Sequence, residues 1–269
     1  MVKVVIIGAA GQMGRQVAYA ALQDTGIQVV GAVVEPNAPE IGVDVGTLAG
    51  LGAIGVAATD DLASAIDAAD AVVEFTAPRA SLGHLGLAAK RGKAAVVGTT
   101  GFSATELDAI GELAGNVPVV LSPNMSVGVN VLLKILPLVT RALGTGYDVE
   151  IVEAHHRRKK DAPSGTALKL AELIAAARDQ ELRDIARFGR EGLAPRKEGE
   201  LGLHAVRGGG IVGEHHVIFV NEGEQVEIVH RALSRQTFAL GAVRAAKFVA
   251  KQKPGLYSMQ DVLAADLDA

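Results

Sequence analysis

The first fourteen residues constrain the fold more than any other part of the chain. An apolar run, Val2 to Ile7, leads directly into the turn GAAGQMG, which contains Gly8, Gly11 and Gly14, and a helix-like segment follows. A glycine-rich turn between a strand and a helix is typical of a dinucleotide-binding βαβ unit. We therefore expect the chain to begin with a parallel sheet that binds a nucleotide at one edge.

The pattern that follows supports a doubly wound sheet as far as Asn124. Short apolar runs alternate with amphipathic segments, and Ser103 and Glu106 have the spacing of a capping box. We expect strands at about 28–34, 71–75, 94–97 and 117–121, and helices at about 12–23, 61–68, 79–90 and from 103 onward. Continuous apolar strands between helices predict a Rossmann-like, parallel α/β fold.

The second half of the chain predicts a different architecture. We expect a helix at about 129–143, a strand at 148–154, a helix at 164–178 and then a hairpin in HHVIFVNEGEQVEIVHRAL. A final helix at 237–251 should return to the first domain. These patterns predict a dinucleotide-binding domain at 1–126 plus 236–269, and a second α+β domain with a mixed or antiparallel sheet at 127–235.

Composition excludes several classes of function. The 269 residues include no cysteine, which removes disulfides, thiolate metal sites and thiol nucleophiles. A formal charge of −4 argues against broad nucleic-acid binding. The longest apolar candidate, 127–139, is interrupted by Asn130, Lys134 and Pro137, so we expect no membrane span. We also expect no metal site. Because no leader pattern precedes Val2, we expect a cytoplasmic protein.

Glu35 strengthens the prediction of a nucleotide site. It stands at the end of the expected second strand, where an acid accepts hydrogen bonds from an adenosine ribose. No cation occurs in the following PNAPEIGVD, Gln12 is neutral, and Arg15 lies on the helix, so NADH is favoured over NADPH. The alternative is a glycine-rich turn beside an exposed acid. Two further loops, GTTGF (98–102) and SPNMS (122–126), end strands at the same edge, and each could instead be a capped turn.

The segment EAHHRRKKDAPSGT, residues 153–166, concentrates positive charge before a helix. A histidine metal site, a solvated charge run and a nucleic-acid patch are alternatives. We favour a catalytic site that binds an anion. Pro163 and Ser164 should start a helix whose first residues, Gly165 and Thr166, present N–H groups to a carboxylate. The histidines and a lysine upstream can donate protons near neutral pH. An anion socket beside a proton donor suits the reduction of an acidic substrate.

Seven motifs together resemble the dihydrodipicolinate reductase family, over nearly the whole chain. They are GAAGQMGRQ, EFTAP, GTTGF, NMSVGVNV, EAHHRRKKDAPSGTAL, GGGIVGEHHV and SRQTFALGAVRAA. The resemblance implies NAD(P)H-dependent reduction of 4-hydroxy-tetrahydrodipicolinate to tetrahydrodipicolinate with loss of water, in lysine and diaminopimelate biosynthesis. It also implies a cofactor domain, a second domain that binds a small dicarboxylate substrate and builds a homotetramer, and closure of the two domains around the substrate.

The resemblance also assigns residues. It implies that His155 is the catalytic acid/base and Lys159 the proton donor. His156, Gly165 and Thr166 would bind the substrate, and Thr100 would touch both ligands. The implied cofactor contacts are Gly8, Ala9, Ala10, Gly11, Gln12, Met13, Glu35, Gly98, Thr99, Thr100, Ser122, Pro123, Asn124 and Met125.

The chain departs from the family pattern mainly where the cofactor is selected. Members that use NADPH often carry arginine after the acid, where this chain has Pro36, and a basic residue at Gln12; Ala77 is basic in some members. Two other functions stay open: a non-catalytic NAD-sensing module, and another amino-acid dehydrogenase on the same fold. We expect His215, His216 and His230 to be structural or interface residues, and His84 to lie on a helix surface. The loop from Arg207 to Gly210 could clamp a carboxylate or form part of a tetramer contact.

Overall fold

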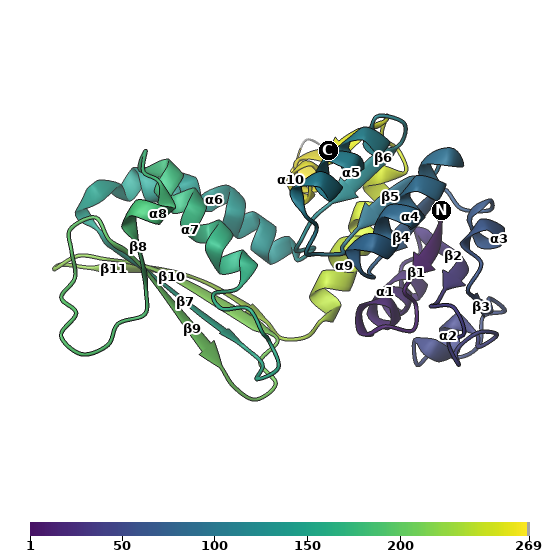
Figure 1. Ribbon diagram of the computed structural model, residues 1–269, viewed down its shortest axis with the longest axis horizontal. Coiled ribbons are helices and arrows are strands. Elements are labelled where there is room, and N and C mark those ends of the chain that lie inside the picture. The colour runs from purple at the N-terminus through teal and green to yellow at the C-terminus, as the bar shows by residue number, and fades with distance from the viewer. Residues whose placement is uncertain (268–269) are drawn as a thin grey trace. The chain divides into compact units, whose positions relative to one another are not determined.

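The computed structural model describes residues 1–267 and divides into two compact units. Unit 1 consists of Met1–Val127 and the chain from Arg235 onward, and unit 2 of Gly128–Ser234. Figure 1 labels the elements of both units. Each unit has its own sheet and its own hydrophobic core. The chain thus leaves unit 1 once, forms unit 2 and returns.

The sheet of unit 1 is parallel, in the order β12-β6-β5-β4-β1-β2-β3. Its strands are β1 (Val2–Ile7), β2 (Ile27–Val33), β3 (Ala58–Thr59), β4 (Ala71–Glu74), β5 (Ala94–Val97), β6 (Pro118–Leu121) and β12 (Gly255–Tyr257). From β1 the chain moves outward to β3, then crosses to the other side of β1 for β4 to β6. Open α/β sheets bind ligands at such a switch point, outside the carboxyl ends of the strands.

Helices cover both faces of this sheet, which confirms the doubly wound fold. They are α1 (Gln12–Gln23), α2 (Val45–Leu48), α3 (Leu62–Ile66), α4 (Pro78–Lys90), α5 (Ala104–Ala114), α9 (Gln236–Val249) and α10 (Met259–Leu267). Strand β1 shows the cause: Val4 and Ile6 join the core under α1 and α9. The alternate residues Val5 and Ile7 join the core under α3, α4 and α5.

The sheet of unit 2 is mixed, in the order β11-β10-β7-β9-β8. Its strands are β7 (Asp148–His155), β8 (Ala186–Phe188), β9 (Leu201–Arg207), β10 (Gly213–Val220) and β11 (Gln225–Ala232). The expected hairpin, β10–β11, is antiparallel, and β10 is also antiparallel to β7, whereas β7 and β8 run parallel to β9. The mixed sheet of the second domain is therefore confirmed.

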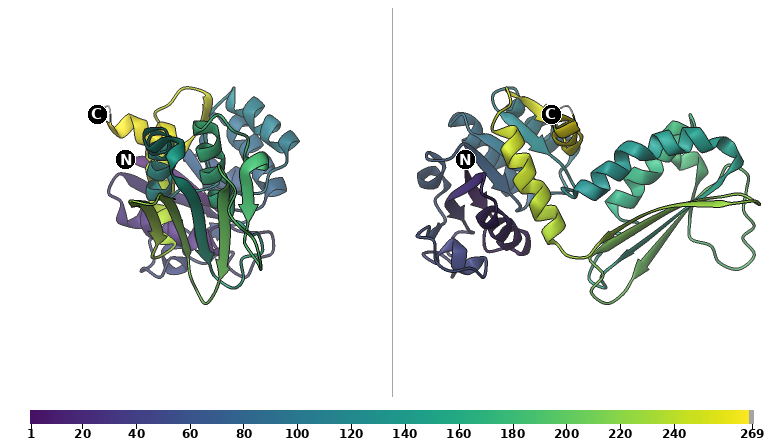
Figure 2. Two further views of the ribbon diagram at one scale, coloured as in Figure 1. Left: turned by 90° about the vertical axis from the view of Figure 1, so that its left-hand side faces the viewer. Right: turned by 180° about the vertical axis from the view of Figure 1, so that it is seen from behind.

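One face of the unit 2 sheet carries the helices. These are α6 (Val127–Leu143), the short 3-10 helix η1 (Gly144–Gly146), α7 (Gly165–Ala177) and α8 (Leu182–Ile185). Leu136 and Leu170 pack with Ile151 and Phe219 in the core between helices and sheet. Figure 2 shows α6 and α7 on one side of the strands, with no helix of unit 2 on the other side among the described residues.

Helix α6 is longer and more apolar than the sequence pattern predicted. With η1 it forms a helical stretch of 20 residues, Val127–Gly146, which continues through Pro137 and reaches a mean hydropathy of 1.5. By length and composition alone it could cross a membrane, although Asn130, Lys134 and Pro137 interrupt the apolar run within it. Leu132 and Leu136 are buried in the core of unit 2, whereas Leu138 is 59% exposed. The helix thus packs as an amphipathic helix of a globular unit, and it is weak evidence for a membrane span.

Candidate functional site

The glycine loop after β1 has the geometry of a phosphate cradle. Gly8 has φ +81°, in the left-handed region, and a Cβ at Gly14 would overlap the Gly8 carbonyl oxygen. Gly11 is the N-cap of α1. Because glycine has no side chain, no N-cap hydrogen bond occupies the first N–H groups of the helix. Exposed N–H groups and the helix dipole favour a bound anion here. The loop therefore fits the pyrophosphate of a dinucleotide.

Arg15 closes one side of this loop. Its Nε donates to the Ala10 carbonyl oxygen at 2.8 Å, and its Nη2 lies 3.2 Å from Glu40 Oε1. Nη1 donates to the Leu48 carbonyl oxygen at 3.4 Å. Glu35, one residue beyond Val34, is exposed at the end of β2. The nearby arginine is thus occupied by the protein's own acceptors.

Sequence reasoning missed a buried carboxylate, Glu74, at the end of β4. It is 2% exposed, and its oxygens accept hydrogen bonds from Ser81 Oγ at 2.6 Å, from Thr99 Oγ1 at 2.8 Å and from Thr76 Oγ1. Burial opposes its ionisation, but the nearby His84 and the hydrogen bonds from these hydroxyls hold the pKa of Glu74 below its usual range. His84 lies on α4 with its side chain 25% exposed, and only its Nδ1 is buried, 3.6 Å from Glu74.

Glu74 and its neighbours tie two predicted cofactor loops to the loop after β4. Thr76 N–H donates to Thr99 Oγ1 at 2.8 Å, which joins the loop after β4 to GTTGF after β5. A Cβ on Gly8 would lie 2.5 Å from the Phe75 carbonyl oxygen, so the glycine loop also abuts this motif. The Phe75 ring occupies the space where a Cβ on Gly98 would stand. The EFTAP motif therefore positions the loops around it.

The predicted cofactor residues form one row along the carboxyl edge of the unit 1 sheet. The exposed members of the row are Gly11, Gln12, Glu35, Thr100 and Pro123. The buried members are Ala9, Thr99, Ser122 and Met125, and Gly8, Ala10, Met13, Gly98 and Asn124 are half-buried. Ser122 Oγ donates to the Asn124 carbonyl oxygen at 2.9 Å, so its side chain shapes the loop after β6. The buried members therefore support the loops, and the exposed ones face the solvent at this edge.

In unit 2, the predicted catalytic histidine lies beside a second buried carboxylate that sequence reasoning missed. Glu153 is 1% exposed, and its Oε2 lies 2.6 Å from His155 Nδ1. Arg207 donates to both oxygens, at 2.7 and 2.8 Å, and Ser164 N–H donates to Oε1 at 3.0 Å. Strand β7 continues through His155, so residues 153 and 155 share one face. Arg207 is therefore paired inside the protein and does not serve as the free carboxylate clamp considered from the sequence.

This cluster shifts the proton equilibria of both partners. Burial would raise the pKa of Glu153, but hydrogen bonds from Arg207 and His155 outweigh it and hold that pKa below its usual range. Burial lowers the pKa of His155, and the neighbouring Glu153 only partly opposes it. The charges of Lys159 and Arg207 add to the lowering. Protonated His155 therefore gives up its proton more readily than an ordinary histidine does.

The remaining predicted substrate residues follow β7 in the chain. His156 Nδ1 is buried and has no hydrogen-bond partner among the described residues. Lys159 Nζ forms an ion pair with Asp161 Oδ2 at 2.9 Å. Helix α7 begins at Gly165 as expected, with Ser164 as N-cap and its Oγ accepting from the Ala167 N–H at 3.2 Å. A Cβ on Gly165 would meet no atom within 4 Å, so open space lies at the helix start, next to Thr166.

The three histidines of β10 and β11, His215, His216 and His230, occupy two faces of the unit 2 sheet. His215 is 3% exposed, its Nε2 lies 3.1 Å from Ser164 Oγ, and its ring packs 5.2 Å from the His155 ring. Burial lowers the pKa of His215 to about 3, so it stays neutral. His230 lies 6.4 Å from His215, whereas His216 faces the opposite side and pairs with Glu227 at 2.6 Å.

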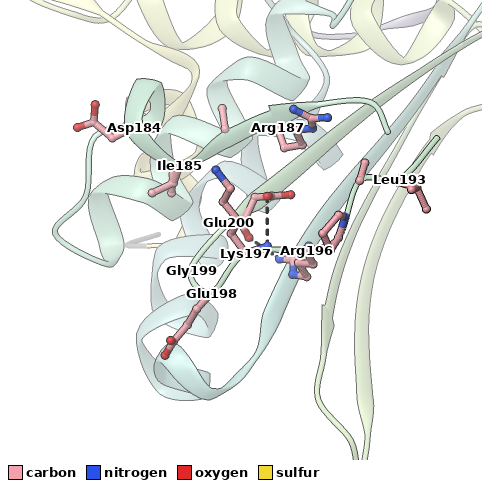
Figure 3. A pocket seen from close by; sticks show the side chains of 12 residues that line it. Asp184, Ile185, Arg187, Leu193, Arg196, Lys197, Glu198, Gly199 and Glu200 are labelled. Atoms are coloured by element: carbon pink, nitrogen blue, oxygen red, sulfur yellow. Dashed lines mark hydrogen bonds between the residues drawn. The ribbon is translucent and has the colours of Figure 1, made fainter. Parts of the chain in front are cut away.

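A cavity of about 460 Å³ in unit 2 contains none of the predicted site residues. Figure 3 shows its lining, formed by residues 184–187 and 193–200. Arg196, the most central cation, is already 2.9 Å from Asp148 and is also paired with Glu150. Its charge is therefore neutralised by the protein, and the concentration of titratable groups around His155 is the stronger candidate for a substrate site.

Comparison with protein families finds matches over nearly the whole chain. The family model of the N-terminus of dihydrodipicolinate reductase matches residues 2–125, and that of its C-terminus matches residues 128–263. The 4-hydroxy-tetrahydrodipicolinate reductase of Rubrobacter xylanophilus is 55% identical over 263 residues, which cover 98% of both chains. The protein of that name from Chromohalobacter salexigens is 51% identical over 265 residues, again 98% of both chains.

Solved structures extend the similarity to the fold. Dihydrodipicolinate reductase from Paenisporosarcina sp. TG-14, solved with bound dipicolinate, matches 97% of this chain and 99% of its own with a TM-score of 0.74 and 25% identity. An amine dehydrogenase from Mycobacterium smegmatis matches with a TM-score of 0.65 and 18% identity, which indicates a shared fold alone. The similarity thus includes both units.

Proposed function

The chain belongs to the dihydrodipicolinate reductase family, and on this premise we propose that it reduces 4-hydroxy-tetrahydrodipicolinate to tetrahydrodipicolinate with a nicotinamide dinucleotide. One observation carries the proposal: the similarity to 4-hydroxy-tetrahydrodipicolinate reductases covers 98% of the chain, including both the glycine loop and the HHRRKKDAPSGT segment. This reaction belongs to lysine and diaminopimelate biosynthesis, and we place the enzyme in the cytoplasm.

NADH is the proposed preferred cofactor, and NADPH a weaker one. An adenosine 2′-phosphate needs a cation beside the acid after β2. Here Glu35 is followed by Pro36, Gln12 is neutral, and the Arg15 guanidinium is held by Ala10 and Glu40. A 2′-phosphate would therefore meet the Glu35 carboxylate without compensation, whereas ribose hydroxyls can donate hydrogen bonds to it.

The reaction adds one hydride and one proton to the substrate and removes one water. The 4-hydroxyl leaves as water together with a hydrogen of the neighbouring ring carbon, and a bound reduced dinucleotide would then supply the hydride that ring C4 gains. Among the protein's own groups, His155 serves as the acid/base and Lys159 as a donor of the proton that the neighbouring carbon gains. Asp161 holds the Lys159 ammonium at 2.9 Å, which fixes it beside the histidines. Electrons and atoms balance, since the dinucleotide leaves oxidised.

The substrate carboxylates are proposed to bind around the start of α7. Gly165 and Thr166 present backbone N–H groups at the helix N-terminus, and the open space beside Gly165 leaves room for an anion. His156 supplies a buried ring nitrogen that lacks a partner among the described residues. Thr100, in the loop after β5, is proposed to contact both cofactor and substrate. The dipicolinate bound to the Paenisporosarcina reductase is a dicarboxylate of this class.

We propose that the uncovered face of the unit 2 sheet builds a homotetramer. Val206 and Val229 are 48% and 36% exposed on this face. Val152 lies on the same face, paired in register with His216, which pairs with Val229 in turn. Apolar side chains on an open sheet face mark an association surface. Light scattering should give four chains per particle, and Val229→Asp should reduce that number.

A coupled assay tests the activity. A synthase generates the labile substrate in situ, and the purified protein should then oxidise NADH; no oxidation with either nicotinamide cofactor would refute the proposal. His155→Gln and Lys159→Ala should each lower kcat about 10²-fold and leave NADH affinity intact. Lys160→Ala, a change of the exposed neighbouring lysine, is the matched control and should keep kcat within about twofold.

A further inference from the structure

We propose that Glu153 is a positioning residue which, together with Arg207, fixes Nε2 of His155 as the ring nitrogen that exchanges a proton with the substrate. The proposal rests on the role given to His155 above and adds two residues to that role. The sequence motifs predict no role for Glu153. An acidic residue in a strand is usually exposed at the surface, so its burial was not expected.

The hydrogen bonds of Glu153 define the tautomer of His155. Oε1 accepts from Ser164 N–H and Arg207, and Oε2 accepts from His155 Nδ1 and Arg207. An ionised carboxylate can only accept, so Nδ1 of His155 must carry a hydrogen. Neutral His155 therefore has its lone pair at Nε2. The charged partner and four hydrogen bonds also explain how a carboxylate stays ionised at 1% exposure.

The other side of the ring borders Gly213, which has no side chain to press on Nε2. A Cβ on Gly213 would lie 3.0 Å from His155 Nε2 and 3.3 Å from Cδ2, closer than ordinary contact. The His215 ring meets His155 edge to face, with ring centroids 5.2 Å apart. Strand β7, the carboxylate and His215 thus hold the imidazole, and Gly213 leaves the space in front of Nε2.

The charged groups around His155 act in opposite directions. Glu153 on β7 favours the imidazolium, whereas Arg207 on β9 and Lys159 in the following segment disfavour it. His215 on β10 is neutral, and Asp161 is paired with Lys159. Removing Glu153's charge should therefore lower the pKa of His155, and removing Arg207's charge should raise it. A residue with a purely structural role would not produce shifts of opposite sign.

The pH dependence of kcat tests this arrangement. Where His155 acts as the acid, activity falls as the pH rises through the pKa of His155, so Glu153→Gln should move this alkaline limb down by about one pH unit or more. Arg207→Gln should move it up. Glu227→Gln is the matched control, because Glu227 pairs with His216 at the same 2.6 Å on the opposite sheet face and should leave the limb in place.

Nitrogen-15 NMR of the imidazoles in the unmodified protein provides a readout that does not depend on changing Glu153 or Arg207. We expect neutral His155 to be the Nδ1–H tautomer, and its signal is assigned as the one that disappears in His155→Gln. Observation of the Nε2–H tautomer would overturn the inference even if the Glu153 or Arg207 variant fails to fold. An unmoved limb in both folded variants would also overturn it. If His155→Gln keeps full kcat, the acid/base role proposed for His155 is wrong. That outcome would refute the proposed function of His155 and is distinguishable from a failure of the role inferred for Glu153.

Discussion

The hydroxyl of Thr99 offers a sharp test of how the cofactor loops are held. It donates to Glu74 Oε2 at 2.8 Å and accepts from Thr76 N–H at 2.8 Å, so it joins two loops through one buried atom. Thr99→Val keeps the branched shape of the side chain and deletes both bonds. Thr140→Val is the matched control, because Thr140 is also buried but its hydroxyl bonds only to Leu136 O of its own helix.

The expected loss follows from the bonds removed. A hydrogen bond to a charged group contributes about 1.5–3 kcal/mol, and a neutral one about 0.5–1.5 kcal/mol. Thr76 is exposed, so water can replace part of the second bond, and Thr99→Val should cost about 2–4 kcal/mol. Thr140→Val should cost about 1 kcal/mol or less, since the Leu136 carbonyl keeps its helical partner.

Urea unfolding, followed by a probe in unit 1, measures the stability change, and fluorescence titration measures NADH affinity. We expect Thr99→Val to weaken NADH binding about tenfold, because the loop that carries Thr100 is no longer tied to the loop after β4. Thr140→Val should leave NADH affinity unchanged. Equal stability losses in the two variants, with equal NADH affinity, would refute the view that Glu74 organises these loops.

Three further predictions concern packing, the glycine loop and pH. Leu136→Ala should cost about 2–5 kcal/mol by urea unfolding, because Leu136 is fully buried, whereas Leu138→Ala, at a site 59% exposed, should cost about 0.5 kcal/mol or less. Gly14→Ala should weaken NADH binding at least tenfold in a titration, since its Cβ would overlap the Gly8 carbonyl. Burial lowers the pKa of His215 to about 3. Below about pH 6.5 only the unfolded chain therefore protonates this imidazole, and the stability of the folded state should decrease as the pH decreases. His215→Gln should flatten that slope when urea midpoints at pH 5 and 7 are compared.

Periodicity and turn chemistry sufficed for most of unit 1. β1, α1 and β5 lie at the expected residues, because each is a short local pattern bounded by glycine or polar residues. The capping box at Ser103 and Glu106 is confirmed, with both reciprocal hydrogen bonds formed. β3 and β12 were not predicted, since strands of two and three residues carry too little pattern to be recognised.

The supporting residues of the candidate site were harder to predict, although one signal was present. Glu153 and His155 are two residues apart in a strand, so they must share a face, but the strand was expected to end at 154. Arg207 reaches this pair because β9 runs parallel to β7 with Arg207 opposite His155. That register depends on a contact across 52 residues, which no local pattern contains. Glu74 was missed for a similar reason, since its partners include Ser81 on α4 and Thr99 in the loop after β5.

The return of the chain to unit 1 determines the order in which the protein can fold during synthesis. Lys247 on α9 pairs with Asp24 at 2.6 Å, and Val243 and Val249 of α9 complete the core that Val4 and Ile6 begin. Unit 2 is whole once residue 234 has left the ribosome, but unit 1 still lacks this helix and its edge strand β12. Unit 1 must therefore wait for α9, with part of one apolar sheet face uncovered, while unit 2 folds ahead of it.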